Sequence, residues 1–160
     1  MPVQCTYWEN GKTTSRLFCS GFGSVEAFSG TGPGRNNPRA TAMANIGPLP
    51  SGRYYLVDRQ SGGRLGWLWD WLGTSLHVTT DHSKWFMLWH ERTGDSAFVE
   101  GIRRGSFRLH PAGPQNLSKG CITVVSPAQF DLLQRYIRSR VPDKPVPGQT
   151  FNAYGTVDVQ

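Results

Sequence analysis

The stretch "SFRLHPAGPQNLSKGCITVV", residues 106–125, predicts two β-strands joined by a loop rich in Gly, Pro and Asn. His110 stands where the first strand ends, and Cys121 stands where the second begins, directly after Gly120. If these strands are neighbours in one sheet, both side chains lie at the same end of that sheet. A chain with four His and three Cys therefore places one of each at the two rims of a single loop.

The composition around this stretch is typical of a mainly β protein. The 160 residues include 19 Gly and 11 Pro, and helical periodicity is rare. This length suits a single domain, which we expect to span residues 1–160. No apolar run approaches the roughly 20 residues that cross a bilayer, and the first residues do not resemble a signal peptide. We therefore expect no membrane insertion and no cleaved leader.

The formal net charge of +6 favours an acidic partner, such as nucleic acid, anionic lipid or a polymer that bears carboxylates. The basic residues are dispersed and form no run of Lys and Arg. This pattern indicates a basic, soluble surface rather than a surface that binds nucleic acid. We expect no nucleic-acid partner.

The N-terminal cysteines lie in a predicted hairpin, residues 3–19, whose turn is the dipeptide "NG". A two-residue turn of type I′ at this dipeptide places Cys5 opposite Arg16. Cys5 and Cys19 could form a disulfide, but this register argues against one. With or without that bond, Cys121 is the cysteine left over.

Further strands are predicted over residues 53–59, 85–91 and 97–104 and in the C-terminal "YGTVDV", and a long loop is predicted over residues 29–52. The clearest helix begins after Ser126, a capping residue, with Pro127 at its first position. Its apolar side chains Phe130, Leu133 and Ile137 recur at i, i+3 and i+7, so we expect it to pack on the sheet.

A Trp-rich segment, "WLWDW", lies inside a predicted insertion of about residues 65–84. In a strand, its three indoles would share one face. Such a face is typical of a core, or of a cover packed over a sheet. The functional alternative is a lid over a cleft, with Trp69 in contact with substrate.

The His–Cys loop contains the parts that a cysteine nucleophile needs. A free thiol is only a few per cent ionised at neutral pH, and His110 could take its proton. The amides of Lys119, Gly120 and Cys121 are candidate donors to an oxyanion. Ser118 would orient the loop or contact substrate, and the charge of Lys119 favours the thiolate. The alternative is an inert, buried Cys beside a surface His.

Two other chemistries fit the sequence less well. A papain-like order needs a His downstream of the nucleophile, and no His follows Cys121. Only Cys19 could then act, and it opens no helix. The histidines lack the spacing of zinc ligands and no Cys-x-x-Cys occurs, so we expect no metal and no cofactor.

The motif "HPAG…SKGCIT" resembles the catalytic motif of L,D-transpeptidase domains. More closely, the chain is similar to the type VI secretion L,D-transpeptidase effector family. That likeness covers "FSGTG", "NNP", "IGPLPSGRYYL", "GGRLG", "WFMLW", "GIRRGSFRLHP", "SKGCIT" and "AYGTVDV", in this order along the chain. The resemblance implies an L,D-transpeptidase-like β-sandwich or sheet with one packed helix.

The resemblance also implies residue roles. Cys121 would be the nucleophile and His110 the general base, while Ser118 and Gly120 would shape the turn. Arg108 would support the site from behind or contact a substrate carboxylate. Lys119 departs from the wider pattern, which commonly has His there, and the His-to-Cys interval is short. A backbone carbonyl next to the His completes the family's triad, and the sequence leaves open which carbonyl this is.

Members of this family are antibacterial toxins that act on peptidoglycan in a rival's periplasm. They cleave the stem tetrapeptide after meso-diaminopimelate and exchange the released D-alanine for other D-amino acids. The resemblance therefore implies a protein made in the producer's cytoplasm, a type VI delivery component and a cognate immunity protein. Two alternatives stay open, a cysteine amidase or endopeptidase that cuts another stem bond, and a non-catalytic cell-wall-binding module.

Overall fold

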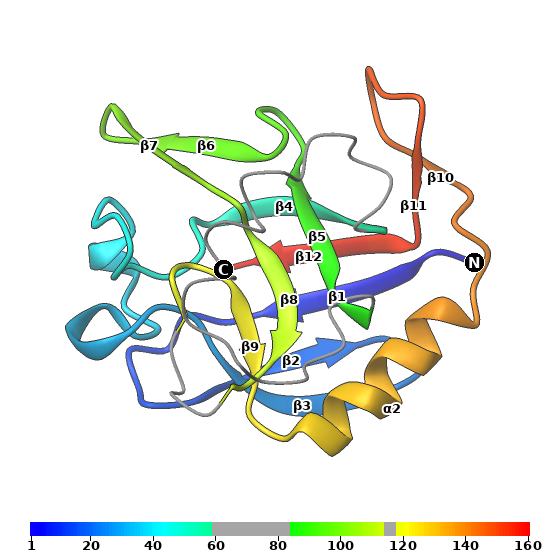
Figure 1. The fold of residues 1–160 in the computed structure, drawn as a ribbon, viewed down its shortest axis with the longest axis horizontal. Coiled ribbons are helices and arrows are strands. Elements are labelled where there is room, and N and C mark those ends of the chain that lie inside the picture. Colours follow the sequence, from blue (N-terminus) through cyan, green and yellow to red (C-terminus); the bar gives the residue numbers. More distant parts are fainter. Residues whose placement is uncertain (59–83, 114–117) are drawn as a thin grey trace.

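Eight strands of the computed structural model close into a barrel (Figure 1). The structure describes residues 1–58, 84–113 and 118–160. The strands follow one another around the barrel in the order β1-β12-β4-β5-β8-β9-β3-β2, and β2 pairs again with β1. Their bounds are β1 Val3–Tyr7, β2 Ser15–Cys19, β3 Gly23–Phe28, β4 Gly52–Asp58, β5 Phe86–His90, β8 Arg108–Pro111, β9 Ile122–Val124 and β12 Gly155–Val159. The predicted mainly β class is confirmed, and closure of the sheet into a barrel is the feature that the sequence did not indicate.

Alternation of side chains explains how the barrel encloses an apolar core. Along β2, Ser15, Leu17 and Cys19 are buried, whereas Arg16 and Phe18 face outward. The other strands bring Val, Leu, Ile and aromatic side chains to the same interior. Because side chains alternate along a strand, a slip of one residue would turn the apolar set of that strand toward water.

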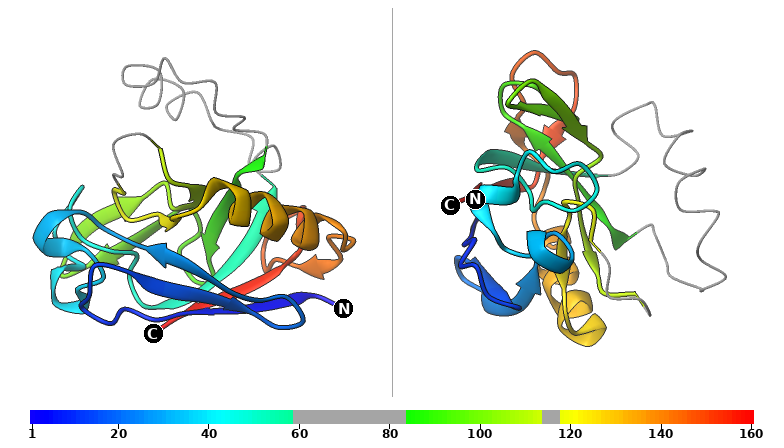
Figure 2. Two further views of the ribbon diagram at one scale, coloured as in Figure 1. Left: turned by 90° about the horizontal axis from the view of Figure 1, so that it is seen from below. Right: turned by 90° about the vertical axis from the view of Figure 1, so that its left-hand side faces the viewer.

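Two small two-stranded sheets lie beside the barrel (Figure 1 and Figure 2). One pairs β6 Ser96–Val99 with β7 Ile102–Gly105, and the other pairs β10 Lys144–Pro145 with β11 Asn152–Ala153. The first of them corrects the prediction of one strand over residues 97–104. The chain reverses there at Glu100 and Gly101, whose φ angles are +51° and +79°. The reversal turns the segment into a hairpin, with Arg104 buried and its neighbour Arg103 exposed.

The helix α2, Pro127–Arg138, forms where the sequence predicts it (Figure 1). The Ser126 hydroxyl accepts a hydrogen bond from the Gln129 amide at 3.3 Å, which caps the first turn. Phe130, Leu133 and Ile137 are buried in the main core, so the packing of this helix is confirmed. Within the described residues, no helix has the length and apolarity needed to cross a bilayer.

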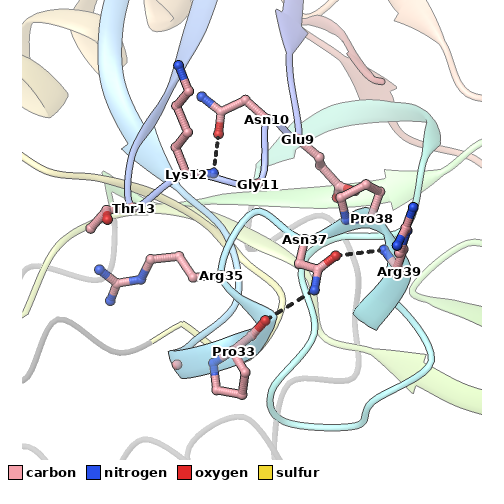
Figure 3. Close-up of a pocket in the computed structure, with 11 residues that line it drawn as sticks. Glu9, Asn10, Gly11, Lys12, Thr13, Pro33, Arg35, Asn37, Pro38 and Arg39 are labelled. Carbon is pink, nitrogen blue, oxygen red and sulfur yellow. Dashed lines mark hydrogen bonds between the residues drawn. The ribbon is translucent and has the colours of Figure 1, made fainter.

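The connection between β3 and β4 packs against the barrel end where β1 finishes. It contains two short 3-10 turns, η1 Gly32–Gly34 and η2 Pro38–Ala40. Buried Asn36 holds the connection in place, because its Oδ1 accepts from the Ser29 amide at 2.9 Å and from the Tyr7 hydroxyl. This connection and residues 9–13 line a surface hollow of about 890 Å³ (Figure 3).

A disulfide joins Cys5 to Cys19 inside the barrel, so the register predicted for the first hairpin is wrong. The two strands pair with Cys5 directly opposite Cys19. The Asn10 side chain accepts from the Lys12 amide at 3.0 Å (Figure 3) and donates to the Thr14 carbonyl at 3.0 Å, and these bonds favour a connection longer than a two-residue turn. These local hydrogen bonds compete with the tight turn that "NG" favours.

Removal of this disulfide should destabilise the barrel. The bond closes a loop with a sequence separation of 14, for which the loss of chain entropy in the unfolded state gives about 3 kcal/mol. The double variant Cys5→Ala/Cys19→Ala should therefore unfold at lower urea concentration than the oxidised wild type. Addition of a reductant should lower the stability of the wild type and leave the variant unchanged. An equal midpoint for both proteins without reductant would contradict this expectation.

Glu9 has a buried carboxyl group and lies at the end of the barrel where β1 finishes. Both of its carboxylate oxygens are shielded from water, and neither has a hydrogen-bond partner among the described residues. This burial raises the pKa of Glu9 to about 7, although the charge of Arg104 opposes the shift. The folded state thus holds this proton more tightly than the unfolded chain, so stability is complete below about pH 4.5 and declines as the pH rises to about 7.

Glu9→Gln should remove this pH dependence, because an amide of the same shape has no proton to lose. We expect the variant to exceed the wild type in free energy of unfolding at pH 8 by about 1–3 kcal/mol, and to match it near pH 4. Urea unfolding at both pH values is the measurement. Glu26→Gln, at an exposed position on β3, is the matched control. The expectation fails if wild type and Glu9→Gln differ equally at both pH values.

Candidate active site

The candidate site lies on β8 and β9, which are neighbours and run parallel. Leu109 pairs with Ile122, and His110 pairs with Thr123. The sequence-based expectation that the two strands are neighbours is therefore confirmed. The expectation that His110 and Cys121 lie at the same end is corrected, because parallel pairing places Cys121 beside the start of β8. His110 lies two residues further along β8 than the position opposite Cys121, which is about 7 Å along the strand at 3.3 Å per residue.

This pairing still brings the predicted pair to one face of the sheet. Side chains alternate along each strand, so Leu109 and Ile122 enter the barrel core. By the same alternation His110, Cys121 and Thr123 share the opposite face. The Thr123 hydroxyl lies 3.5 Å from His110 Nε2, which confirms that these two side chains are adjacent.

His110 has a defined ring orientation and tautomer. Its Nδ1 lies 2.8 Å from the Pro111 carbonyl oxygen. A carbonyl only accepts hydrogen bonds, so Nδ1 carries the proton and Nε2 is the basic nitrogen. The indole of Trp85 stacks on the imidazole with ring centroids 4.5 Å apart. The carbonyl that contacts the imidazole is thus that of Pro111, and the basic nitrogen lies near the Thr123 hydroxyl.

Cys121 is buried, with 3 % of its surface exposed, and its thiol is 3.7 Å from the Ser106 carbonyl oxygen. Burial raises the pKa of the Cys121 thiol, and this effect exceeds the opposing effects of Arg108 and Arg104. The thiol therefore keeps its proton at rest. A nucleophilic attack from this position requires a base to remove the proton as the substrate arrives.

Arg108 lies beside Cys121, because the register of β8 and β9 places the two residues opposite each other. Its side chain is 1 % exposed and forms an ion pair with Asp95 at 3.0 Å. The same guanidinium nitrogen donates to the Phe107 carbonyl at 2.8 Å. The charge and the backbone N–H of Arg108 both favour the Cys121 thiolate. Its role, as support of the site or as a contact with a substrate carboxylate, remains a prediction.

The turn before Cys121 is held by Ser118. The Ser118 hydroxyl donates to the Cys121 carbonyl at 2.8 Å and accepts from the Gly30 amide at 3.3 Å. Ser118 is buried, and these two hydrogen bonds join the turn to the β3–β4 connection. Lys119 is exposed at the apex. Gly120 has φ +101°, a conformation that favours glycine.

Arg104 is a residue of this site that the sequence analysis missed. Its buried guanidinium donates to the Lys119 carbonyl at 3.5 Å and to carbonyls of the β3–β4 connection. The pair "RR" in a predicted strand contained a usable signal, because neighbouring side chains on a strand face opposite ways. One of the two arginines therefore had to face inward.

The predicted lid lies almost entirely outside the described residues, as do Trp69, His77 and His82. Lys84, at the end of that predicted insertion, forms an ion pair with Asp131 of α2 at 3.3 Å. The roles of Trp69 and of the insertion remain predictions.

Gly120→Ala should disturb the turn that carries the thiol. A Cβ there would overlap the Arg104 guanidinium and lie 3.3 Å from the Phe107 ring, at a φ that L residues rarely adopt. We expect a loss of about 1–3 kcal/mol in stability and slower alkylation of Cys121. Gly113→Ala is the matched control, since a Cβ at that position meets no atom of the described residues within 4 Å. Equal alkylation rates and equal melting temperatures for the two variants would contradict the strain expected in Gly120→Ala.

A family model matches most of the chain. The model of the Tlde1 domain covers residues 23–149, about four fifths of the sequence, and this span includes β8, β9 and the turn before Cys121. No curated protein matches the sequence. The match confirms the resemblance to type VI secretion effectors at the level of the family. The chain belongs to the Tlde1 domain family.

Proposed function

We propose that the protein is a cysteine L,D-carboxypeptidase and L,D-transpeptidase that acts on the tetrapeptide stems of peptidoglycan. Membership of the Tlde1 family indicates a type VI effector toxin that is secreted into target cells. The observation that carries the finer proposal is the pairing of β8 with β9. Side-chain alternation then gives His110 and Cys121 the same face of the sheet, and the Pro111 carbonyl leaves Nε2 as the basic nitrogen of His110, which supports the proposal.

The first step is acylation of Cys121. His110 Nε2 takes the thiol proton as sulfur attacks the carbonyl carbon of meso-diaminopimelate, and a carbon–sulfur bond forms. The amides of Lys119, Gly120 and Cys121 would stabilise the oxyanion. The carbon–nitrogen bond to D-alanine then breaks. The imidazolium returns its proton to the leaving amine, so the products are a thioester and free D-alanine.

The second step resolves the thioester. Water would give the tripeptide stem, whereas the amine of another D-amino acid would give an exchanged tetrapeptide. In both cases His110 accepts a proton from the nucleophile, and Cys121 leaves as a thiolate that takes this proton back. The access of water to the thioester would set the ratio of hydrolysis to exchange.

The charges of the protein suit a substrate rich in carboxylates. The net charge is +6, and exposed Lys119 stands at the apex of the catalytic turn. We assign the contact with a stem carboxylate to Lys119, because Arg108 is buried against Asp95. Trp69 is proposed as a further contact with the substrate. An immunity protein that blocks this site and a delivery component of the secretion system would be the protein partners, and the periplasm of the target cell the place of action.

The proposal predicts loss of activity in Cys121→Ala and in His110→Gln. Each variant should release D-alanine from purified tetrapeptide muropeptides at least about 10³-fold more slowly than wild type, because the nucleophile or its base is gone. Mass spectrometry of the products is the measurement, and it also reveals cleavage of any other stem bond. His90→Gln is the matched control, since His90 ends β5 and contacts the Thr93 hydroxyl in the turn that follows, away from the β8–β9 pair.

Three results would overturn parts of the proposal. Activity retained in Cys121→Ala would remove the thiol from the mechanism. Cleavage at another bond by the wild type would identify an amidase or endopeptidase. Binding to sacculi without any change in muropeptides would identify a non-catalytic cell-wall-binding module.

A further inference from the structure

The guanidinium of Arg104 joins two segments that are far apart in the sequence. From β7, its Nη1 donates to the Thr41 carbonyl at 2.7 Å and to the Pro48 carbonyl at 2.5 Å. Its Nη2 donates to the Gly47 carbonyl at 2.9 Å and to the Lys119 carbonyl at 3.5 Å. One side chain thus ties the β3–β4 connection to the turn that precedes Cys121.

The same guanidinium packs directly against this turn. A Cβ on Gly120 would overlap Arg104 Nη2, so the turn approaches the guanidinium more closely than any other residue type allows. A second contact between the two segments, from the Gly30 amide to the Ser118 hydroxyl, runs beside the first. The backbone position of Cys121 therefore depends on the β3–β4 connection at two points, and Arg104 provides one of them.

The charge of Arg104 also reaches the thiol. Arg104 and Arg108 both favour the Cys121 thiolate, whereas Asp95 opposes it. Burial lowers the pKa of the Arg104 guanidinium, and the charges of Tyr54, Cys121 and Glu9 oppose that shift. Among the described residues, Glu9 forms no hydrogen bond to Arg104. The four hydrogen bonds that the Arg104 guanidinium donates all go to backbone carbonyls, which hold its positive charge in place.

We propose that Arg104 is a positioning residue for the nucleophile, which holds the Ser118–Cys121 turn against the β3–β4 connection and supplies a buried positive charge to the thiolate. A buried charge costs solvation free energy, so a purely apolar contact would serve packing alone better. Planar guanidinium geometry explains why Arg stands here, because its forked donors reach several carbonyls at once. This inference deepens the proposed function and rests on it for its effect on turnover.

The charge is tested without any assay of peptidoglycan. Because Cys5 and Cys19 are bonded to each other, Cys121 is the free thiol of the oxidised protein, and its alkylation by iodoacetamide reports its ionisation. In Arg104→Gln the midpoint of alkylation rate against pH should rise by about one unit. Arg103→Gln, the same charge loss at the exposed neighbour, should keep the wild-type midpoint. Equal midpoints in all three proteins would overturn the electrostatic part of the proposal.

The positioning is tested by Arg104→Lys, which keeps the charge but loses the planar fork. We expect this variant to retain a midpoint near that of wild type and to lose at least about tenfold in kcat for release of D-alanine, with KM changed less than threefold. Wild-type kcat in Arg104→Lys would overturn the positioning. If Arg104→Gln fails to fold, the alkylation midpoints of Arg104→Lys and Arg103→Gln are compared instead. A midpoint that rises by about one unit in Arg104→Lys, which keeps the charge, would contradict the electrostatic part of the proposal.

The failure of this inference differs from failure of the proposed function. Should Cys121→Ala still release D-alanine, the proposed mechanism falls while the alkylation midpoints still report on Arg104. Should Cys121→Ala be inactive and Arg104→Lys fully active, the mechanism stands and the positioning role of Arg104 falls.

Discussion

Parallel pairing of β8 with β9 is the constraint on which the candidate site depends. Both strands are short, and Leu109 and Ile122 are anchored in the barrel core. Their burial obliges the alternate side chains, His110 and Cys121 among them, to the other face. A register change of one residue in either strand would send one of the two into the core. The same apolar contacts that stabilise the barrel therefore determine that an imidazole and a thiol share one surface.

The thiol is stabilised in its protonated form and surrounded by groups that favour its ionisation. Burial raises the pKa of Cys121, whereas Arg108 and Arg104 lower it. A thiol in this balance stays protonated until a base acts, and the Nδ1–Pro111 hydrogen bond leaves Nε2 of His110 as the basic nitrogen. In the proposed mechanism, this arrangement protects the thiol at rest and confines its reactivity to the moment at which a substrate carbonyl lies against the turn.

Local signals were sufficient for part of this structure. The capped helix with its Phe130 stripe and the alternating strands follow from short-range chemistry, and the motif around Cys121 was sufficient for the family. The rest depends on contacts between distant segments. The parallel direction of β9 relative to β8 is a relation between two strands that neither strand's own sequence indicates. The Cys5–Cys19 register depends on side-chain bonds of Asn10 that override the "NG" turn. The role of Arg104 depends on carbonyls some 60 residues upstream, which no local pattern indicates.

The covalent intermediate on Cys121 offers the most direct test of the account. The protein should be mixed with a purified tetrapeptide stem, quenched in acid within the first turnover, and analysed by intact-mass and peptide mass spectrometry. The account predicts an adduct with the mass of the tripeptide acyl group, located on Cys121, together with one equivalent of free D-alanine. Release of D-alanine with no adduct on Cys121, or with an adduct on another residue, would contradict it.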